Sequence, residues 1–370
     1  MVRSGQRRVG NGATVRGNGS PATMQDVARL AGVSVKTVSN VLSGYEHVST
    51  RMHDRVMSAV TELDYEINIS ARNLRSGRTK VIGLAVPELS QAYFAELADA
   101  VIRAAKAHDY TVLIEQTSSD NDEIATVAAM RRHAIDGLIF SPIALGPGDV
   151  SGLSVDFPVV VLGDWVEGSP ADHITLPNTA AIRTATEHLL DLGRCRIAVV
   201  GAHPEGPVGT SALRFNGYAD ALTARGIVIS PELVADVPLW HRADGAAAVT
   251  QLLAAGTEFD GVVCFNDALA LGAMSALQLA GLRVPEDVAV VGFDDIEDAR
   301  FSSPALTTIS PGREELARLA VDRVLARIEA GGDAAESVHV EVGYSLEVRA
   351  STVSLSAKPV PAAMEPLLHD

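Results

Sequence analysis

The sequence has only two cysteines, Cys195 and Cys264, and they do not form a metal-binding spacing. Each lies in an apolar, strand-like run, which predicts buried free thiols in a reducing cytoplasm. No run of about 18 apolar residues occurs, so we expect no membrane-spanning helix. The first 20 residues contain four arginines and five glycines but no apolar core. This composition is unlike a secretory signal and predicts a flexible tail over 1–21.

The patterns that mark common catalytic and phosphate-binding sites are also missing. The ten histidines include no HExxH motif and no other metal-ligand spacing. The stretch GPGDVSG (146–152) follows a strand-like run but lacks the GxGxxG spacing of a nucleotide-binding loop. The 47% hydrophobic and 21% charged residues are typical of a folded globular chain, and 370 residues leave room for two or three domains. We therefore expect a protein that is no enzyme and carries neither a metal nor a cofactor.

The charge of the chain is divided unevenly between its two ends. Residues 1–80 contain 12 Lys and Arg against 6 Asp and Glu, a balance of +6. Residues 81–370 contain 18 Lys and Arg against 40 Asp and Glu, a balance of −22, so that the whole chain carries −16. A basic N-terminal segment joined to an acidic body indicates that only the first segment approaches a polyanion.

Residues 22–66 have the pattern of a small helical module. Thr23 and Asp26 match a capping box, in which each side chain accepts a hydrogen bond from the other residue's backbone N–H, and predict a helix that ends at Ala31. Gly32 ends this helix because glycine adopts a positive φ at low cost. Two short helices joined by such a turn are typical of a helix-turn-helix.

Ser34 is expected to cap the second helix, about 35–42. The outer face of this helix is polar, with Lys36, Ser39 and Asn40, whereas the inner face has Val38, Val41 and Leu42. A third helix starts at Ser49, and its inner face is formed by Met52, Val56, Val60 and Leu63. Three helices of this size can enclose a small core.

The segment 67–79 continues the basic region and is expected to form a short helix. It contains Arg72, Arg75 and Arg78 without any acidic residue, and Leu74 stands between two of these arginines. An apolar side chain flanked by guanidinium groups fits a wedge that enters the minor groove of DNA while the arginines contact phosphates.

Residues 80–355 alternate between strand-like and helix-like stretches. Two successive series of this kind predict two lobes, each built on a doubly wound parallel sheet. The strand-like runs of the first series are 80–87, 110–115, 136–142 and 158–164. Those of the second series are 196–201, 232–237, 260–265 and 288–295.

Aromatic and polar side chains stand near the ends of these runs, where ligands of parallel sheets bind. Aromatic rings cover the apolar faces of a sugar, while carboxylates, amides and guanidinium groups bond its hydroxyls. The residues expected to bind such an effector are Tyr93, Phe94, Asp164, Arg214, Trp240, Asn266 and Asp294. We interpret the neighbouring Asp267 and Asp295 as helix N-caps. Asp294 and Asp295 are not expected to be a catalytic pair, since adjacent strand residues point to opposite faces.

These residues together resemble the lactose-repressor/galactose-repressor (LacI/GalR) family. TMQDVARLAGVSVKTVSNVLSG (23–44) matches the DNA-binding start of that family nearly throughout, and ARNLRSGRT (71–79) is similar to its hinge helix. The likeness extends to about residue 352. It implies a helix-turn-helix module followed by a body like that of periplasmic binding proteins.

The resemblance assigns roles to individual positions of the module. It implies that Val35, Lys36 and Asn40 face base edges in the major groove and that Leu74 enters the minor groove. The residues facing phosphates are then Ser34, Thr37 and Ser39, with Arg72 and Arg75 beside the wedge. The family more often has arginine at the position of Asn40. Because asparagine prefers the adenine edge, the half-site is expected to differ from the commonest one.

The same resemblance bears on the effector, the lobes and the assembly. QAYFAEL (91–97) is similar to the purine-repressor branch, but Val208 stands where that branch has an arginine, which favours a sugar over a purine.

The chain is expected to cross between lobes, so that lobe 1 comprises 80–177 and 305–336 and lobe 2 comprises 178–304 and 337–355. The proline-containing tail 356–370 has no heptads, which predicts a homodimer on a near-palindromic operator.

We therefore predict a cytoplasmic transcriptional regulator that represses carbohydrate-metabolism genes under the control of a sugar-like effector. One alternative is a purine- or nucleoside-responsive repressor of the same family. Another is a sugar-binding transport protein, which would share the body but would need export.

Overall fold

The computed structural model describes residues 22–42, 45, 47–65, 78–117, 123–143, 145, 147–164, 166, 168–203, 209–237, 239–331 and 336–354. The chain divides into two compact units, Met1–Arg78 and Thr79–Asp370, and each is described by itself. Both predicted tails and most of the predicted hinge helix lie outside the described residues.

The first unit contains the three predicted helices, α1 (Met24–Ala31), α2 (Val35–Leu42) and α3 (Thr50–Glu62). The capping box is confirmed: the Thr23 backbone N–H donates to the Asp26 carboxylate over 3.1 Å, and the Asp26 N–H donates to the Thr23 hydroxyl over 3.3 Å. Gly32 adopts φ 62° and ends α1 as expected.

The three helices enclose a core in which the side chains of Val27, Val38 and Val56 are fully buried. Arg55 of α3 donates to the Ala31 carbonyl over 2.5 Å, at the end of α1. A guanidinium group at this place satisfies a carbonyl without a helical partner and complements the negative end of the helix dipole. The pattern of the sequence did not indicate this contact.

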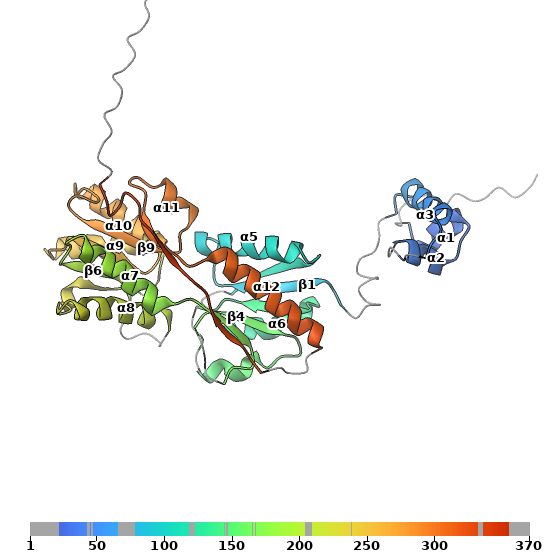
Figure 1. Cartoon of the computed structure of the whole chain (residues 1–370), viewed down its shortest axis with the longest axis horizontal. Coiled ribbons are helices and arrows are strands. Elements are labelled where there is room, and N and C mark those ends of the chain that lie inside the picture. The colour runs from blue at the N-terminus through green and yellow to red at the C-terminus, as the bar shows by residue number, and fades with distance from the viewer. Residues whose placement is uncertain are drawn as a thin grey trace, which may run out of the picture. The chain divides into compact units, whose positions relative to one another are not determined.

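The second unit contains two lobes, each built on a sheet of six strands (Figure 1). The sheet of lobe 1 has the order β11-β5-β4-β3-β1-β2 and is parallel. Its strands are β1 (Val81–Val86), β2 (Thr111–Gln116), β3 (Gly137–Phe140), β4 (Val159–Leu162), β5 (Asp172–Thr175) and β11 (His339–Glu341). Its helices are α5 (Ala92–Lys106), α6 (Glu123–Met130) and α12 (Arg313–Ala330), with short 3₁₀ turns at Arg131–His133 and Pro147–Leu153.

Both faces of the first sheet are covered, α5 and α12 lying on one and α6 on the other (Figure 1). Along β1, Ile82, Leu84 and Val86 point to the cluster under α5 and α12, whereas Ala85 points to the cluster under α6. Burial on both faces explains why this strand reads as a nearly continuous apolar run.

The sheet of lobe 2 has the order β12-β10-β9-β8-β6-β7, and all its pairs are parallel except β10 with β12. Its strands are β6 (Ile197–Ala202), β7 (Val234–Asp236), β8 (Gly261–Cys264), β9 (Ala289–Phe293), β10 (Thr307–Ser310) and β12 (Ser345–Glu347). Its helices are α7 (Asn178–Asp191), α8 (Thr210–Ala224), α9 (Arg242–Ala254), α10 (Asp267–Leu279) and α11 (Glu297–Phe301), with a 3₁₀ turn at Pro231–Leu233.

Glycines let the paired helices of lobe 2 pack closely. A Cβ on Gly272 of α10 would lie 1.9 Å from the Arg242 carbonyl oxygen of α9, and one on Gly217 of α8 would lie 2.2 Å from the Thr179 carbonyl oxygen of α7. Since backbone atoms cannot move aside cheaply, any larger residue would push these helix pairs apart.

The predicted crossings between the lobes are wrong in two places. Residues 305–309 were assigned to lobe 1, but β10 pairs with β9 of lobe 2, with Thr307 opposite Val291. Residues 337–342 were assigned to lobe 2, but β11 pairs with β5 of lobe 1, with His339 opposite His173. Side chains add to both pairings: Ile309 is buried in the core of lobe 2, and the Thr175 hydroxyl bonds His339 over 2.9 Å.

The two cysteines differ in exposure. Cys264 is buried in β8, as predicted, but Cys195 is exposed, so the prediction of burial is wrong there. Cys195 precedes β6 at the sheet border, where its N–H donates to the Asp260 carboxylate over 3.0 Å. Within the described residues, no helix combines the length and the apolarity that crossing a membrane requires.

A buried carboxylate joins the late segments of the chain to lobe 1. Asp172 of β5 is 1% exposed and accepts hydrogen bonds from Arg323 (2.8 Å), Arg327 (2.5 Å) and the N–H of Val338 (2.9 Å). Burial alone would raise the pKa of Asp172, but the bonds from Arg327, Val338 and Arg323 outweigh burial and lower it. This one side chain therefore holds α12 and β11 against the sheet.

Replacing Asp172 by asparagine should lower the free energy of unfolding by roughly 2–4 kcal/mol, because two partly buried guanidinium groups lose their counter-charge. Urea unfolding at pH 7 measures this change. A lowered pKa means that the carboxylate stabilises the fold above its unfolded pKa and that this contribution disappears as the pH falls, so the two proteins should converge in acid. Asp322→Asn is the control, since the exposed Asp322–Arg318 pair should contribute less than about 1 kcal/mol.

Candidate functional sites

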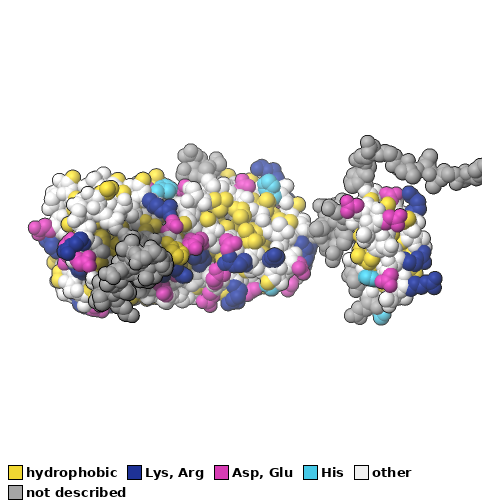
Figure 2. Space-filling view, turned by 90° about the horizontal axis from the view of Figure 1, so that it is seen from above, with side chains coloured by type: hydrophobic (Ala, Val, Ile, Leu, Met, Phe, Trp, Pro, Cys, Tyr) yellow, Lys and Arg dark blue, Asp and Glu magenta, His cyan; other side chains and the backbone are white. Residues whose placement is uncertain are grey.

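The outer face of α2 carries the residues expected to contact DNA. Ser34 and Lys36 are exposed, and the other four, Val35, Thr37, Ser39 and Asn40, are half-buried. On the opposite face Val38 and Val41 are buried, as predicted. Basic side chains lie along one side of this unit (Figure 2). The division of α2 into a polar face and a core face is thus confirmed.

Two hydroxyl groups stand at the N-terminus of α2. The backbone N–H of Thr37 donates to the Ser34 hydroxyl over 3.1 Å, and the two hydroxyls are 2.8 Å apart. Ser34 is therefore the predicted cap. The backbone N–H groups and the dipole at a helix start favour a phosphate, so both hydroxyls stand where DNA-backbone contacts are expected. The hinge candidates Arg72, Leu74 and Arg75 lie outside the described residues.

In the second unit, a cavity of about 240 Å³ lies between the two lobes. It is bordered by the chain after β1, β8 and β9 and by the start of α9, so it lies beyond the carboxyl ends of the strands. Three of the predicted effector residues line it, namely Tyr93, Asn266 and Asp294. Its other lining residues are Ser90, Gln91, Ala92, His241, Arg242, Ala243, Ala268 and Ile296.

Asp294 is the most unusual residue of this cavity. It directly follows β9, adopts φ 117°, and is 6% exposed. Within the described residues its carboxylate accepts no hydrogen bond, although its backbone N–H donates to the Ile309 carbonyl over 2.8 Å. Burial raises the pKa of Asp294 to about 7, against the opposing effect of Arg214 and Arg313. Backbone strain of this kind is typical of ligand and active sites.

Arg214 supplies the positive charge beneath Asp294. Its guanidinium group is buried, lies 3.6 Å from the centre of the Phe293 ring, and donates to the Asn178 side chain over 2.8 Å and to the Phe265 carbonyl. Burial lowers the pKa of Arg214, while Asp294 acts in the opposite direction. Arg214 does not line the cavity, and its Nε and Nη1 atoms already donate to protein acceptors.

Trp240 and Asn266 are joined by a hydrogen bond near the cavity. The Trp240 indole N–H donates to the Gly201 carbonyl over 3.1 Å, and the ring meets Phe265 edge to face at 5.9 Å. The Asn266 amide donates to the Trp240 carbonyl over 3.0 Å, while its oxygen accepts from the Leu269 N–H over 2.8 Å. Asn266 is therefore also the N-cap of α10.

The predictions that Asp267 and Asp295 are N-caps are wrong. Asp267 is fully buried and accepts from the Thr308 hydroxyl over 2.6 Å and from the Ile296 N–H over 3.0 Å. Asp295 instead pairs with Arg300 at 2.9 Å and with Arg349 at 2.5 Å. Both carboxylates are committed to tertiary contacts.

Asp164 and Phe94 do not line the cavity. Asp164 accepts from the Thr210 hydroxyl and from the Asn178 amide, each over 3.0 Å. Because Asn178 also bonds Arg214, it connects Asp164 to the charged centre of the site. Phe94 packs on the core of lobe 1 and meets Tyr93 edge to face at 5.2 Å.

Sequence reasoning missed three residues of this site, Asn178, Phe293 and His241. Phe293 and His241 directly neighbour the predicted Asp294 and Trp240, so the ends of those strands were the available signal. Asn178 starts the helix after Pro177, and no local pattern connects it to Arg214, which lies 36 residues later.

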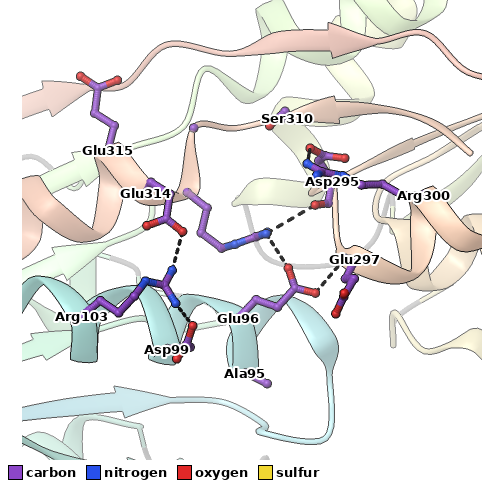
Figure 3. A pocket seen from close by; sticks show the side chains of 12 residues that line it. Ala95, Glu96, Asp99, Arg103, Asp295, Glu297, Arg300, Ser310, Glu314 and Glu315 are labelled. Atoms are coloured by element: carbon purple, nitrogen blue, oxygen red, sulfur yellow. Dashed lines mark hydrogen bonds and ion pairs between the residues drawn. The ribbon is translucent and has the colours of Figure 1, made fainter.

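A larger cavity, of about 830 Å³, lies between α5, α11 and the start of α12 (Figure 3). Its basic groups are already paired: Arg103 with Asp99 and Glu314, and Arg313 with Glu96 at 2.5 Å. Among the described residues, no group of three or more His, Cys, Asp and Glu side chains is placed to hold a metal ion. The smaller cavity differs in that it contains an acceptor, Asp294, to which no described residue donates.

Two family models match the chain. The model described as bacterial regulatory proteins, lacI family, matches residues 23–68, and a periplasmic binding protein-like domain matches residues 186–352. The ribose operon repressor of Haemophilus influenzae is 33% identical over 310 residues, which cover 83% of this chain and 92% of that protein. The repressor PurR of the same species is 31% identical over 338 residues, which cover 90% and 99%.

A solved structure has a similar fold over nearly the same length. It is the lac repressor dimer bound to operator and the anti-inducer ONPF. The TM-score is 0.79 at 28% identity, with 90% of this chain and 100% of that chain covered.

Replacing Asp294 by asparagine should remove the part of the pH dependence of stability that comes from ionising this buried carboxylate. A pKa raised from 3.8 to about 7 corresponds to roughly 4 kcal/mol at most. Since the unfolded state releases its proton first, the wild type should lose stability relative to the variant between about pH 4 and 7. Thermal unfolding across this range measures the difference. Asp191→Asn, at an exposed residue, should show none, and equal curves for all three proteins would contradict the prediction.

Proposed function

This chain belongs to the lacI family of bacterial regulatory proteins, and from that membership we propose that it represses carbohydrate-metabolism genes from the cytoplasm. It binds a near-palindromic operator as a homodimer, and a sugar or sugar derivative in the cleft controls this binding. The observation that carries the proposal is the Asp294 carboxylate, which lines the interlobe cavity and accepts no hydrogen bond from any described residue. A polyol supplies the donors that this carboxylate lacks.

The DNA-binding half of the proposal rests on α2. Its outer face presents Lys36 near the capped N-terminus and Asn40 about one turn further along. A helix that lies in the major groove presents its side chains in this way. In the proposal Val35, Lys36 and Asn40 contact base edges, and Ser34, Thr37 and Ser39 contact phosphates. The segment 67–79 places Leu74 in the minor groove between Arg72 and Arg75.

The effector half rests on the cleft. Tyr93 supplies aromatic surface, and Asn266 and Asp294 supply polar groups, which together suit a sugar. Both nitrogen and oxygen of the Asn266 side chain already have partners, so Asp294 contributes the open acceptor. An effector changes operator binding only if it has different affinities for the two arrangements of the lobes. The site binds this effector without transforming it.

A second candidate is a purine- or nucleoside-responsive repressor. The similarity to PurR over 90% of this chain favours it, as does QAYFAEL at the start of α5. A thermal-shift comparison of D-ribose, hypoxanthine and guanine separates the two. Stabilisation by a purine alone would replace the sugar in the proposal.

Asn40→Ala should relax sequence preference at one base-pair position of each half-site by about 1–3 kcal/mol, because a bidentate base contact is removed. Binding of a randomised operator library, followed by sequencing, measures the preference at every position.

Arg318→Ala, in the exposed part of α12, is the matched control and should leave operator binding unchanged. Uniform weakening on all sequences by Asn40→Ala would instead make Asn40 a phosphate contact. For the wild type, affinity should fall steeply as salt rises. A salt-independent interaction, or none with the promoter fragments of neighbouring genes, would contradict the proposed function.

A further inference from the structure

A histidine and a glutamate face each other across the cleft between the lobes. Glu88 follows β1 of lobe 1, whereas His241 stands directly before α9 of lobe 2. The His241 Nε2 lies 2.8 Å from a carboxylate oxygen of Glu88. This contact joins residues that are 153 positions apart and lie on different lobes.

Each member of the pair is held in place from its own lobe. The Nδ1 of His241 lies 3.0 Å from the Asp244 carboxylate, which also accepts from the His241 backbone N–H over 3.0 Å. Glu88 accepts from the Ser90 hydroxyl and from the Gln91 amide over 3.4 Å. Side chains that are oriented before they meet lose little entropy in forming a bridge.

The bridge stands at the border of the effector cavity. His241, Ser90 and Gln91 all line the cavity that contains Asp294. A second contact between the lobes, from the Thr210 hydroxyl to the Asp164 carboxylate over 3.0 Å, closes the cleft elsewhere. A ligand in the closed cleft must therefore fit behind the Glu88–His241 pair or break it.

The volume behind the pair is small. At about 240 Å³ it lies below the roughly 300–1,000 Å³ of pockets that bury drug-sized ligands. One pentose or hexose ring fits into such a space, whereas two linked rings need about twice as much as one.

We propose that Glu88 and His241 form a gate across the effector cleft, and that the closed gate restricts effectors to a single sugar ring. This inference rests on the proposed function for the class of ligand, but not for the gate itself. His241 and Glu88 determine specificity by limiting size, and Asp244 positions His241.

The charges around the pair make the gate sensitive to pH. The hydrogen bond to Glu88 raises the pKa of His241, against the effect of burial and with the help of Asp244. The pKa of Glu88 is lowered by bonds from Ser90 and then from His241. The other charged groups bordering the cavity are Arg242 on α9 and Asp294 after β9. The bridge is strongest while His241 is protonated and weakens as the pH rises through that raised pKa.

The gate itself is tested without any ligand by measuring the distance between the lobes. In a Cys195→Ser background, nitroxide labels at Lys106→Cys of α5 and Gln251→Cys of α9 report this distance by pulsed electron resonance. His241→Ala and Glu88→Gln should lengthen or broaden the distance distribution at pH 6 and remove its change between pH 6 and 8.

The matched control is His203→Ala, because His203 forms an equally short bridge to Asp236, 2.8 Å, within lobe 2 alone. This control should keep the wild-type distances and their pH dependence. Wild-type behaviour of the His241→Ala protein would overturn the gate.

The size limit is tested by thermal shift with D-ribose, D-glucose and cellobiose. A single-ring sugar should raise the Tm of the wild type by several degrees. Cellobiose should raise only the Tm of His241→Ala, and its affinity for the wild type should be at least tenfold weaker than for this variant. Equal stabilisation of the wild type by cellobiose would overturn the size limit. If no sugar stabilises either protein, the sugar class of the proposed function fails, and with it the size limit, while the label distances still decide the gate.

Discussion

The charged pair Arg214 and Asp294 is the interaction on which the effector site depends. The Arg214 guanidinium connects α8 to Asn178 at the start of α7 and to the carbonyl that follows β8, and it stacks on Phe293 at the end of β9. A buried guanidinium group is tolerable only with such partners and a nearby negative charge. Asp294 is the largest charge acting on Arg214, and burial raises the pKa of Asp294 itself to about 7. The two groups therefore oppose each other's loss of charge beside the cavity.

From this centre, three contacts extend to lobe 1. The Asn178 side chain forms hydrogen bonds with both Arg214 and Asp164, and the Asp164 carboxylate also accepts from the Thr210 hydroxyl. On another side, Arg313 bonds the Asp294 carbonyl over 3.1 Å and pairs with Glu96 of α5. The Glu88–His241 pair is the third. A ligand that alters the position of Asp294 therefore acts on contacts that hold the lobes together, which is the requirement for a change of shape to follow binding.

The division of charge along the chain follows from this arrangement. The body has an excess of acidic residues, many of them in exposed surface ion pairs, and only the first 80 residues carry a net positive charge. Because interactions between exposed charges are screened within about 10 Å in ordinary salt, the acidic body need not weaken the approach of a basic module to DNA. An effector receptor and a DNA-binding module can thus share one chain with opposite charges.

Local chemistry let the sequence by itself determine the helical module, with its Thr23–Asp26 capping box, the Gly32 turn and the two faces of α2. It also determined the alternation of strands and helices in the body, since strands buried on both faces have apolar sequences.

The tertiary structure decided the features that need partners distant in the chain. Short strands such as β10 and β11 could have joined either sheet, and their place depends on pairing with β9 and with β5, of which β5 is distant from β11 in the chain. Asn266 rather than Asp267 caps α10, because the Asp267 carboxylate accepts hydrogen bonds from Thr308 and Ile296 instead. The bridge from His241 to Glu88 likewise exists only once the lobes meet, and no local pattern encodes a contact across 153 residues.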